Sequence, residues 1–384
     1  MDGRYFNYTQ NIAESRWERG SFLANWWRLY AGDPHWVPPY KPDLRCALEP
    51  SRNPHLRRME PLYIYTTALP RSARLHPDIR SLDWSAELSR GLTYERPVAA
   101  ALLLHDPRRP DRSASLAILH CANDLEALER LAGYALEQAA EAGFQRLLGP
   151  VGLAPHLGSG LLLDHWDRLP PLHAAYNPPY LPDLFEAVFA PLERAQVFEL
   201  AVPPAPGSPT RQNRMARSGP GRIVSINPAR LAQDLLPLFA AAGTAWQSFP
   251  PPDPAEAEFI LRWLSRWPLY AWLAELDGQP AGFMLLQPDL AAQLRRAGGG
   301  RAWWQRLWLN LPATLRVPHG RLLFGGVLPE LRRQGLGSQL LETAFAAARQ
   351  QGWQSLSTGP LLEAAFLQHR GAFARQSYAI YQFT

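Results

Sequence analysis

The chain has 384 residues, of which 47% are hydrophobic and 19% charged, and its formal net charge is +5. This composition is typical of a globular protein that can bury real cores, and the length favours two domains over one. Lys41 is the only lysine, and the many arginines are scattered rather than arranged in a stripe with aromatic residues, so we expect no nucleic-acid surface.

No apolar run approaches the ~20 residues that a membrane-spanning helix needs, and the first residues contain neither a basic leader nor an apolar signal core. We therefore expect a cytoplasmic protein with no membrane span. Abundant arginine, alanine, leucine and proline indicate GC-rich coding and a bacterial source. Cys46 and Cys121 are far apart and lack metal-ligand spacing, so neither a disulfide framework nor a metal site is expected.

In the first half of the chain, residues 116–136 predict a strand that leads into a helix. The connection between them reads Cys-Ala-Asn-Asp at 121–124 and contains no glycine. Asp124 is expected to cap the helix, because an aspartate at this position accepts a hydrogen bond from a free backbone N–H group of the first turn.

Residues 132–150 have an echo at residues 341–360. Each segment reads as an alanine-rich helix, then a glycine, an aromatic residue and a glutamine, a short strand, and a Gly-Pro stop. The two glycines are Gly143 and Gly352, too far apart for a solenoid repeat but suitably spaced for two copies of one domain. We therefore expect a duplicated fold.

A linker is expected between the two copies. Residues 202–222 are rich in proline, glycine, serine and arginine and show almost no apolar periodicity, which indicates a surface segment. We place the boundary near residue 207, with an N-terminal domain at 1–206 and a C-terminal domain at 207–384.

The second half of the chain begins with two amphipathic helices, predicted at 231–246 and 254–267, with Asp253 as the N-cap of the second. A hairpin follows around Asp277 and Gly278, a pair that accepts the positive φ angles of a tight turn. Both features are local signals with a direct physical basis.

Residues 289–320 read as a mostly helical insertion with three tryptophans, Trp303, Trp304 and Trp308. The favoured interpretation is an amphipathic helix that packs on the core. The rest of the chain is expected to form, in order, a strand at 321–329, a long helix, a strand at 353–360, a helix at 361–371 and a strand at 377–383. This order indicates an α/β sheet of mixed direction.

The turn that precedes the long helix holds two arginines and two glycines in the hexapeptide Arg-Arg-Gln-Gly-Leu-Gly at 332–337. A strand that runs into a helix through such a turn points several backbone N–H groups, backed by the positive end of the helix dipole, into one concavity. Gly335 and Gly337 let a pyrophosphate approach the backbone, while Arg332 and Arg333 add positive charge. The turn is therefore predicted to be an anion cradle.

The spacing is neither that of a nucleoside-triphosphate loop nor that of a dinucleotide fingerprint. It matches the signature Arg/Gln-x-x-Gly-x-Gly/Ala. With its flanking segments 325–331 and 338–348, the turn closely resembles motif A of the GNAT superfamily of acyl-coenzyme A (acyl-CoA) dependent N-acyltransferases. The resemblance covers residues 223–384 and implies an α/β protein with two tandem GNAT-like mixed β-sheet domains and flanking helices.

The resemblance also implies where the donor binds. The loop amides would hold the pyrophosphate of acetyl-CoA or another acyl-CoA, and the preceding strand would pair with the pantetheine arm where two strands splay apart. Glycines within that strand are consistent with a ligand that approaches closely. The residues so implied are Gly326, Val327 and Leu328 in the strand and Arg332, Arg333, Gln334, Gly335, Leu336, Gly337 and Ser338 in the loop.

The superfamily often uses a tyrosine, in a pattern like Leu-Tyr-x-x-x-Gly-Phe, to protonate the leaving thiolate. Leu367 stands at that position here. Tyr378 and Tyr381 on the final strand and His369 are the nearby groups that could replace the tyrosine, and Glu363 could act as a base. Each of these side chains is also open to a purely structural role.

The first half resembles the N-terminal part of large GNAT-like proteins. Its segment 184–189, Leu-Phe-Glu-Ala-Val-Phe, is similar to a degenerate form of the tyrosine pattern. The connection that ends at Asp124 contains no glycine cradle. We therefore expect this copy to keep the fold without the cofactor. It would act as structural support, or as a wall of the acceptor pocket lined by Trp36, Tyr176 and Tyr180.

These observations predict an N-acyltransferase, in the first instance an N-acetyltransferase, in which the amine of a small molecule or peptide attacks acyl-CoA directly. One alternative is a non-catalytic acyl-CoA sensor or scaffold, which the missing tyrosine favours. Another is an enzyme like a long-chain N-acyl amino acid synthase, with Trp303, Trp304 and Trp308 over an acyl tunnel. The intact cradle and scattered charge disfavour a peptidyl transferase that uses aminoacyl-tRNA. The acceptor, the acyl length and the oligomeric state, a homodimer included, stay open.

Overall fold

The protein is described by a computed structural model that covers residues 5–14, 16–70, 96–152, 157–205, 221–227, 230–241, 248–250 and 252–383. Its strands form one 13-stranded sheet of mixed direction. The strands of the first half are β1 (Tyr5–Ile12), β2 (Leu62–Pro70), β3 (Arg96–Leu104), β4 (Ser113–Cys121), β5 (Arg146–Val151), β6 (Leu161–Leu162) and β7 (Ala190–Ala201). Those of the second half are β8 (Arg222–Ser225), β9 (Tyr270–Leu276), β10 (Gln279–Pro288), β11 (His319–Val327), β12 (Ser355–Ser357) and β13 (Phe373–Phe383).

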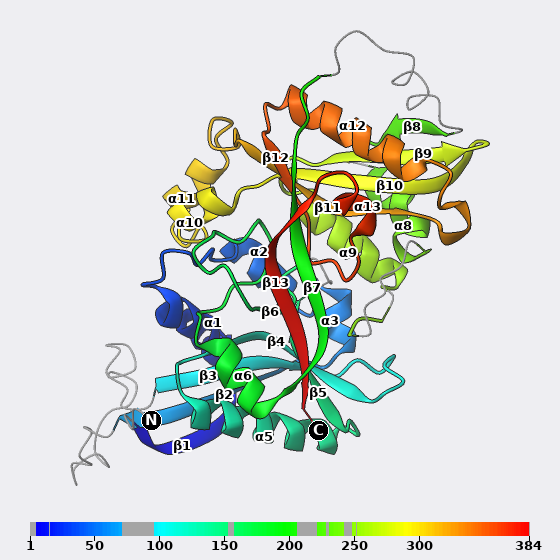
Figure 1. Ribbon diagram of the computed structural model, residues 1–384. Coiled ribbons are helices and arrows are strands. Elements are labelled where there is room, and N and C mark those ends of the chain that lie inside the picture. The colour runs from blue at the N-terminus through cyan, green and yellow to red at the C-terminus, as the bar shows by residue number, and fades with distance from the viewer. Residues whose placement is uncertain are drawn as a thin grey trace.

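Helices cover both faces of the sheet in each half (Figure 1). The helices of the first half are α1 (Arg16–Tyr30), α2 (Lys41–Ala47), α3 (Pro54–Arg58), α5 (Leu125–Glu141) and α6 (Leu181–Val188). Those of the second half are α8 (Leu231–Ala241), α9 (Pro254–Leu264), α10 (Ala291–Arg296), α11 (Trp303–Leu309), the 3₁₀ turn η3 (Pro329–Leu331), α12 (Leu336–Gln350) and α13 (Ala365–Gln368).

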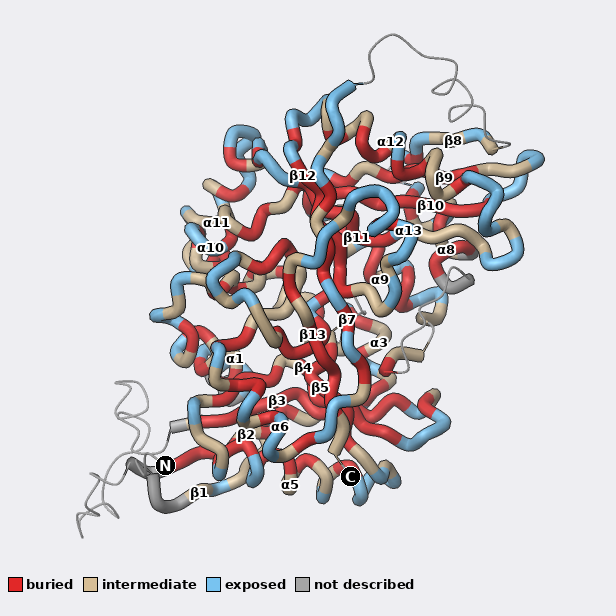
Figure 2. Tube along the Cα trace, viewed as in Figure 1, coloured by how far each residue is buried: buried red, intermediate tan, exposed pale blue. Residues whose placement is uncertain are grey.

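The cores lie between these layers. In the first half, α5 and α6 pack on one face of the sheet, and α1 and α3 pack on the other. In the second half, α12 covers one face while α8 and α9 cover the opposite one. β3 shows why the sequence permits this arrangement, because its run of alanines and leucines is buried on both sides of the strand. Figure 2 shows the buried residues running through the centre of the molecule.

The two halves share their last strands. The sheet order is β1-β2-β3-β4-β5-β13-β7-β12-β11-β10-β9-β8. β7, which ends the first half, pairs with β12 of the second half, while β13, which ends the second half, pairs with β5 of the first. β7 and β13 also pair with each other, and in Figure 1 they run side by side through the middle of the molecule. Each half therefore completes the sheet of the other.

The internal echo is confirmed by the strand pairing. β4 and β5 form a parallel pair with Ser113 opposite Arg146, and β11 and β12 form a parallel pair with His319 opposite Ser355. In each half the first strand of this pair leads into a long helix, α5 or α12, which returns to the second strand. The same unit therefore occurs twice, as expected for a duplicated fold.

Most of the predicted linker, residues 206–220, lies outside the described residues. The division of the chain into domains at 1–206 and 207–384 therefore stays a prediction. Within the described part of the chain, no helix is long and apolar enough to cross a membrane. In that same part, no group of three or more His, Cys, Asp or Glu residues is arranged to hold a metal ion.

The tryptophan-rich insertion differs from the expectation. Residues 289–320 do contain two helices, α10 and α11, but the aromatic side of α11 does not pack on the core. Trp303 is 71% exposed and Trp304 is 58% exposed, so the expectation of a packed amphipathic helix was wrong for these two. The buried side of α11 consists of Leu309, with Trp308 partly buried beside it.

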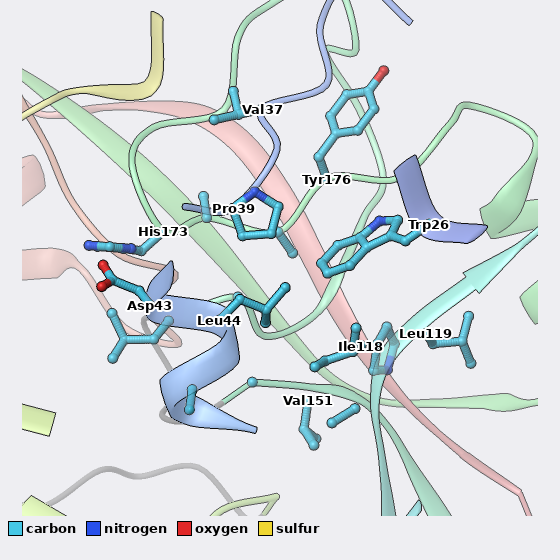
Figure 3. A pocket seen from close by; sticks show the side chains of 18 of the residues that line it. Trp26, Val37, Pro39, Asp43, Leu44, Ile118, Leu119, Val151, His173 and Tyr176 are labelled. Atoms are coloured by element: carbon cyan, nitrogen blue, oxygen red, sulfur yellow. The ribbon is translucent and has the colours of Figure 1, made fainter. Parts of the chain in front are cut away.

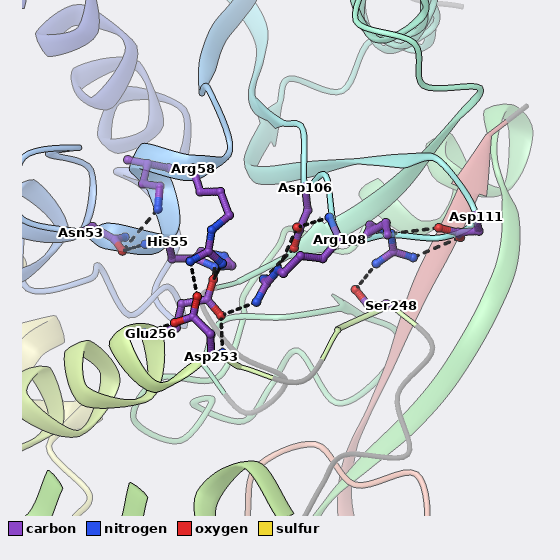
Figure 4. Close-up of polar contacts among 11 residues, drawn as sticks. Asn53, His55, Arg58, Asp106, Arg108, Asp111, Ser248, Asp253 and Glu256 are labelled. Atoms are coloured by element: carbon purple, nitrogen blue, oxygen red, sulfur yellow. Dashed lines mark hydrogen bonds and ion pairs between the residues drawn. The ribbon is translucent and has the colours of Figure 1, made fainter. Parts of the chain in front are cut away.

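A cluster of charged side chains joins the two halves at the start of α9 (Figure 4). Glu256 is buried and contacts His55 of α3, while its carboxylate also lies 2.9 Å from Arg108 Nη1 and 3.3 Å from Arg58 Nη1. Arg58 in addition pairs with Asp253, the N-cap of α9. The predicted cap is therefore confirmed, and it also serves as an attachment point between the halves.

Replacing Glu256 with glutamine is expected to lower the free energy of unfolding by ~1–3 kcal/mol, because the partly buried cations around it lose a buried, charged partner. Burial by itself would raise the pKa of the Glu256 carboxyl, but His55 and Arg108 outweigh it and hold the pKa below its ordinary value. The carboxylate thus stabilises the fold above about pH 4, where it is ionised even in the unfolded chain. Its contribution is lost as the pH falls through the lowered pKa, so the two proteins should converge in acid.

Urea unfolding at pH 7 and at more acidic pH measures this difference. Glu258→Gln on the same helix is a matched control, because Glu258 pairs with Arg262 on an exposed surface. We expect that control to change the free energy of unfolding by no more than ~0.5 kcal/mol. Equal losses in the two variants would show that the cluster does not stabilise the fold.

Candidate functional site

The strands β11 and β12 diverge soon after they meet. They pair only from His319 opposite Ser355 to Arg321 opposite Ser357, and the rest of β11 has β10 alone as its neighbour. Leu328 donates its backbone N–H to Ala281 on the β10 side. Because backbone groups alternate along a strand, Gly325 and Val327 present theirs to the opposite, open edge. The splay predicted for this strand pair is present.

The glycine turn ends at an uncapped helix. α12 begins after Gly335, where no side chain caps the helix, and the first backbone N–H that finds an intrahelical partner is that of Gln339, which donates to Gly335. The N–H groups of Leu336, Gly337 and Ser338 therefore point out of the helix without an intrahelical acceptor. The turn combines free donors with the positive end of a long helix, which is the chemistry that an anion needs.

The backbone of the turn is curled by two left-handed residues. Arg333 has φ 65° and Gly335 has φ 86°. Arg332, Arg333, Gln334 and Gly335 are all exposed, and the Nε atom of Arg332 donates to the carbonyl oxygen of Val327 at 3.2 Å. This bond folds the turn back over the end of β11, so the concavity opens beside the splayed edge of the sheet.

Two side chains of the α13 region complete this concavity, and sequence reasoning missed both. Arg370 donates to Ser338 Oγ at 2.7 Å and lies 3.3 Å from Glu342, so it brings a cation to the first turn of α12. The ring of Phe366 is 45% exposed and lies beside Gly337, whose Cβ position would be 3.8 Å from it. The spacing of Phe366 and Arg370, one helical turn apart, was the available signal.

The corresponding helix of the first half is capped. Residues 122–124 alone connect β4 to α5, whereas residues 328–335 connect β11 to α12. The carboxylate of Asp124 accepts a hydrogen bond from the backbone N–H of Ala127 at 3.1 Å and another from the hydroxyl of Tyr8. The expected cap is confirmed. A negative charge therefore occupies the place where the second half offers free donors.

The tyrosine position of the family pattern is occupied by a core residue. Leu367 is 8% exposed and packs in the apolar cluster under α12. His369, one of the suggested replacements, is exposed and its Nδ1 atom contacts the carbonyl oxygen of Ala365. Neither side chain is aimed at the splay by any contact in the described structure.

Tyr378 and Tyr381 lie on β13, within the sheet of the first half. Both are almost fully buried. The Tyr381 hydroxyl donates to Glu186 at 3.4 Å, and burial, with the nearby Glu186, raises the pKa of Tyr381 to about 12. The Tyr378 hydroxyl donates to the carbonyl oxygen of Ala175 at 3.3 Å, and burial raises the pKa of Tyr378 well above its ordinary value.

Tyr378 and Tyr381 differ in their position relative to a hollow of about 550 Å³. It lies between β7, β13 and the segment that leads from β12 into α13. Tyr378 and Glu363 both line it, while Tyr381 does not and packs instead in the core under α5. The structure thus brings together two of the four candidate catalytic residues, beside the chain segment that leaves the splay.

Residues 236–363 match the family model described as the acetyltransferase (GNAT) family. The matched range contains β11, the glycine turn, α12 and β12. These residues therefore form a GNAT-type domain within the second half of the chain. GNAT enzymes generally use acetyl-CoA or another acyl-CoA, so the matched domain indicates an acyl-CoA dependent acetyltransferase. No curated protein matches it in sequence.

Solved GNAT structures resemble the whole chain in fold. A tandem GNAT protein from the clavulanic acid biosynthesis pathway is 15% identical, with a TM-score of 0.55 over 98% of both chains. A GCN5-related glucosamine N-acetyltransferase region of a fungal multi-domain β-N-acetylglucosaminidase is 13% identical, with a TM-score of 0.58 over 98% of this chain and 38% of that one. A conserved protein of unknown function from Enterococcus faecalis V583 is 8% identical, with a TM-score of 0.51 over 98% of this chain and 72% of that one. At these identities the comparison shows a tandem GNAT fold.

Proposed function

We propose that the second half of the chain is an N-acyltransferase that binds acyl-CoA at the glycine turn and transfers the acyl group to the amine of a small molecule or peptide. The observation that carries this proposal is the uncapped start of α12 beside the splayed edge of β11. An uncapped helix N-terminus with a curled, glycine-containing turn suits a pyrophosphate. The open edge of β11 offers backbone groups to an extended arm, as an added strand would require.

The residues of the turn fit the donor. Leu336, Gly337 and Ser338 would donate backbone N–H groups to the pyrophosphate, while Arg332, Arg333 and Arg370 would supply charge. In the strand, Gly325 and Val327 are better placed than Leu328, because the N–H of Leu328 already donates to Ala281. Gly326 would contribute by allowing the arm to approach closely.

The acceptor would enter through the hollow lined by Glu363 and Tyr378. In the reaction, the amine nitrogen bonds to the thioester carbonyl carbon, the C–S bond breaks, the nitrogen loses a proton, and the thiolate gains one. Glu363 is exposed and could receive the proton through water. Tyr378 keeps its proton at neutral pH because burial raises its pKa, and its hydroxyl would have to leave the carbonyl oxygen of Ala175 to protonate the thiolate.

A direct test combines donor binding with release of free thiol. Titration calorimetry with acetyl-CoA is expected to find one equivalent per chain, because the first half has Asp124 in place of the cradle. A panel of small amines and peptides, assayed for free thiol, is expected to include acceptors that consume the thioester. Two equal donor sites would contradict the asymmetry between the halves. Tight binding without turnover on any amine would favour the sensor or scaffold alternative.

A further inference from the structure

A second cavity, distinct from the donor turn, lies where β4 and β5 diverge in the first half. Its volume is about 210 Å³. Figure 3 shows Ile118, Leu119 and Val151 on one side of it and Trp26 and Tyr176 on another. Helices of both halves close it, since α2 contributes a lining residue, Leu44, and the second half contributes Trp263, Trp267 and Leu294.

The backbone of β4 is shaped to keep this cavity open. β4 pairs with β5 as far as Ala117 opposite Val151, and then the two strands separate. Ile118 has φ 50°, a left-handed conformation that is a genuine outlier for a β-branched residue. Such strain persists only where the surrounding structure enforces it, and it is concentrated at ligand sites. The outlier lies in the wall of the cavity.

The carboxylate of Asp43, the imidazole of His55 and the amide of Asn177, which all line the cavity, already have partners within the protein. Asp43 pairs with Arg266, and His55 pairs with Glu256. The side chain of Asn177 both accepts from and donates to the backbone of Leu162. His173 is uncharged, because burial lowers its pKa to about 3. Among the described residues, the wall therefore offers no unpaired charge to a ligand, and its surface is mostly aromatic and aliphatic. Its unpaired polar atoms are uncharged: Nε1 of Trp26, Trp263 and Trp267 and Nε2 of His173.

We propose that this cavity binds one uncharged, apolar molecule about the size of one or two fused aromatic rings. An apolar cavity of about 150 Å³ takes up benzene, so a larger cavity whose wall is mostly aromatic and aliphatic suits a somewhat larger ring system. Acyl-CoA does not fit this description, since its phosphates would meet no cradle and the carboxylate of Asp124 holds the start of α5.

A molecule bound in this cavity would affect the second half of the chain, which carries the proposed donor site. Trp263 lies on α9 and Trp267 lies three residues after its end, and α9 covers one face of the sheet that contains β11. Leu157 lines the cavity and packs in the same apolar cluster as Leu323 of β11. A molecule in the cavity therefore touches side chains that support the donor strand, while the binding itself does not depend on the cradle.

The test uses naphthalene as an uncharged probe and naphthalene-1-sulfonate as its charged counterpart. Titration calorimetry and thermal unfolding of the full chain are expected to show one naphthalene bound per chain and a raised Tm. Naphthalene-1-sulfonate should have little effect, because its charge finds no partner in the wall. Comparable binding of the two compounds, or no binding of naphthalene, would overturn the proposal.

Variants locate the binding. Leu44→Trp fills the cavity and is expected to weaken naphthalene binding at least tenfold, whereas Leu307→Trp introduces the same residue on the exposed side of α11 and should have no effect. Ala175→Phe is a second filling variant from a different wall, in case the first does not fold. Gly337→Trp should leave naphthalene binding unchanged. Undiminished binding in a folded filling variant would place the probe elsewhere.

Discussion

Replacing Gly337 with tryptophan is expected to abolish acyl-CoA binding while the protein stays folded. Gly337 lies in the first turn of α12 and has no positive φ, so a side chain there does not strain the backbone. A tryptophan would project into the concavity between the turn and Phe366 and would cover the donors that a pyrophosphate needs. Titration calorimetry with acetyl-CoA measures the loss, and circular dichroism verifies the fold.

Gly337→Ala is the matched control. A Cβ at this position would lie 3.8 Å from the Phe366 ring and 3.9 Å from a methyl group of Val327, which is ordinary van der Waals contact. The family signature also accepts alanine here. We therefore expect near-parental affinity for the alanine variant. Unchanged affinity in the tryptophan variant would show that the donor binds elsewhere.

Gly335 is a less informative position for this test. Its φ of 86° belongs to the left-handed region, so any other residue there strains the turn even though space is available. A loss of binding in a Gly335 variant would combine strain with obstruction. The two glycines of the turn therefore have different roles. Gly335 allows a left-handed backbone conformation, whereas Gly337 leaves room for a ligand.

Local features of the site could be predicted from the sequence because their causes are local. Asp277 and Gly278 form the hairpin turn between β9 and β10 with positive φ angles of 50° and 74°. Asp124 and Asp253 cap the helices that follow them. In each case a residue type and its immediate neighbours determine the geometry, so one segment of sequence carries the whole signal.

The exchange of β7 and β13 could not be predicted in the same way. β7 alternates buried and exposed residues over part of its length, whereas residues 378–381 of β13 are all buried. Neither pattern indicates which neighbour the strand will pair with. The choice depends on contacts between segments far apart in the chain. For the same reason Tyr378 was recognised as a candidate from its strand, but its position in the hollow with Glu363 was not.

The role of Arg370 could not be predicted from the family pattern, because that pattern concerns the proton donor whose position Leu367 occupies. The segment around Leu367 instead contributes the charge of Arg370 and the ring of Phe366 beside the first turn of α12. The contact depends on how α13 packs against α12, which a motif does not report. The exposed Trp303 and Trp304 are a similar case, since the side of α11 that faces the core depends on its neighbours.

Replacing Tyr378 with phenylalanine is expected to lower kcat by ~10²-fold or more with little change in donor binding, as for the loss of a general acid. Tyr378 lines the hollow, and burial raises its pKa, so its hydroxyl stays protonated. The kcat of the parent enzyme should therefore not fall through ionisation of Tyr378 up to about pH 10. Tyr381→Phe is the matched control on the same strand. The Tyr381 side chain does not line the hollow, and it packs in the core under α5, where its hydroxyl donates to Glu186. That variant should keep kcat within a few fold of the parent. If the two variants behave alike and both retain turnover, water in the hollow and not a tyrosine protonates the leaving thiolate.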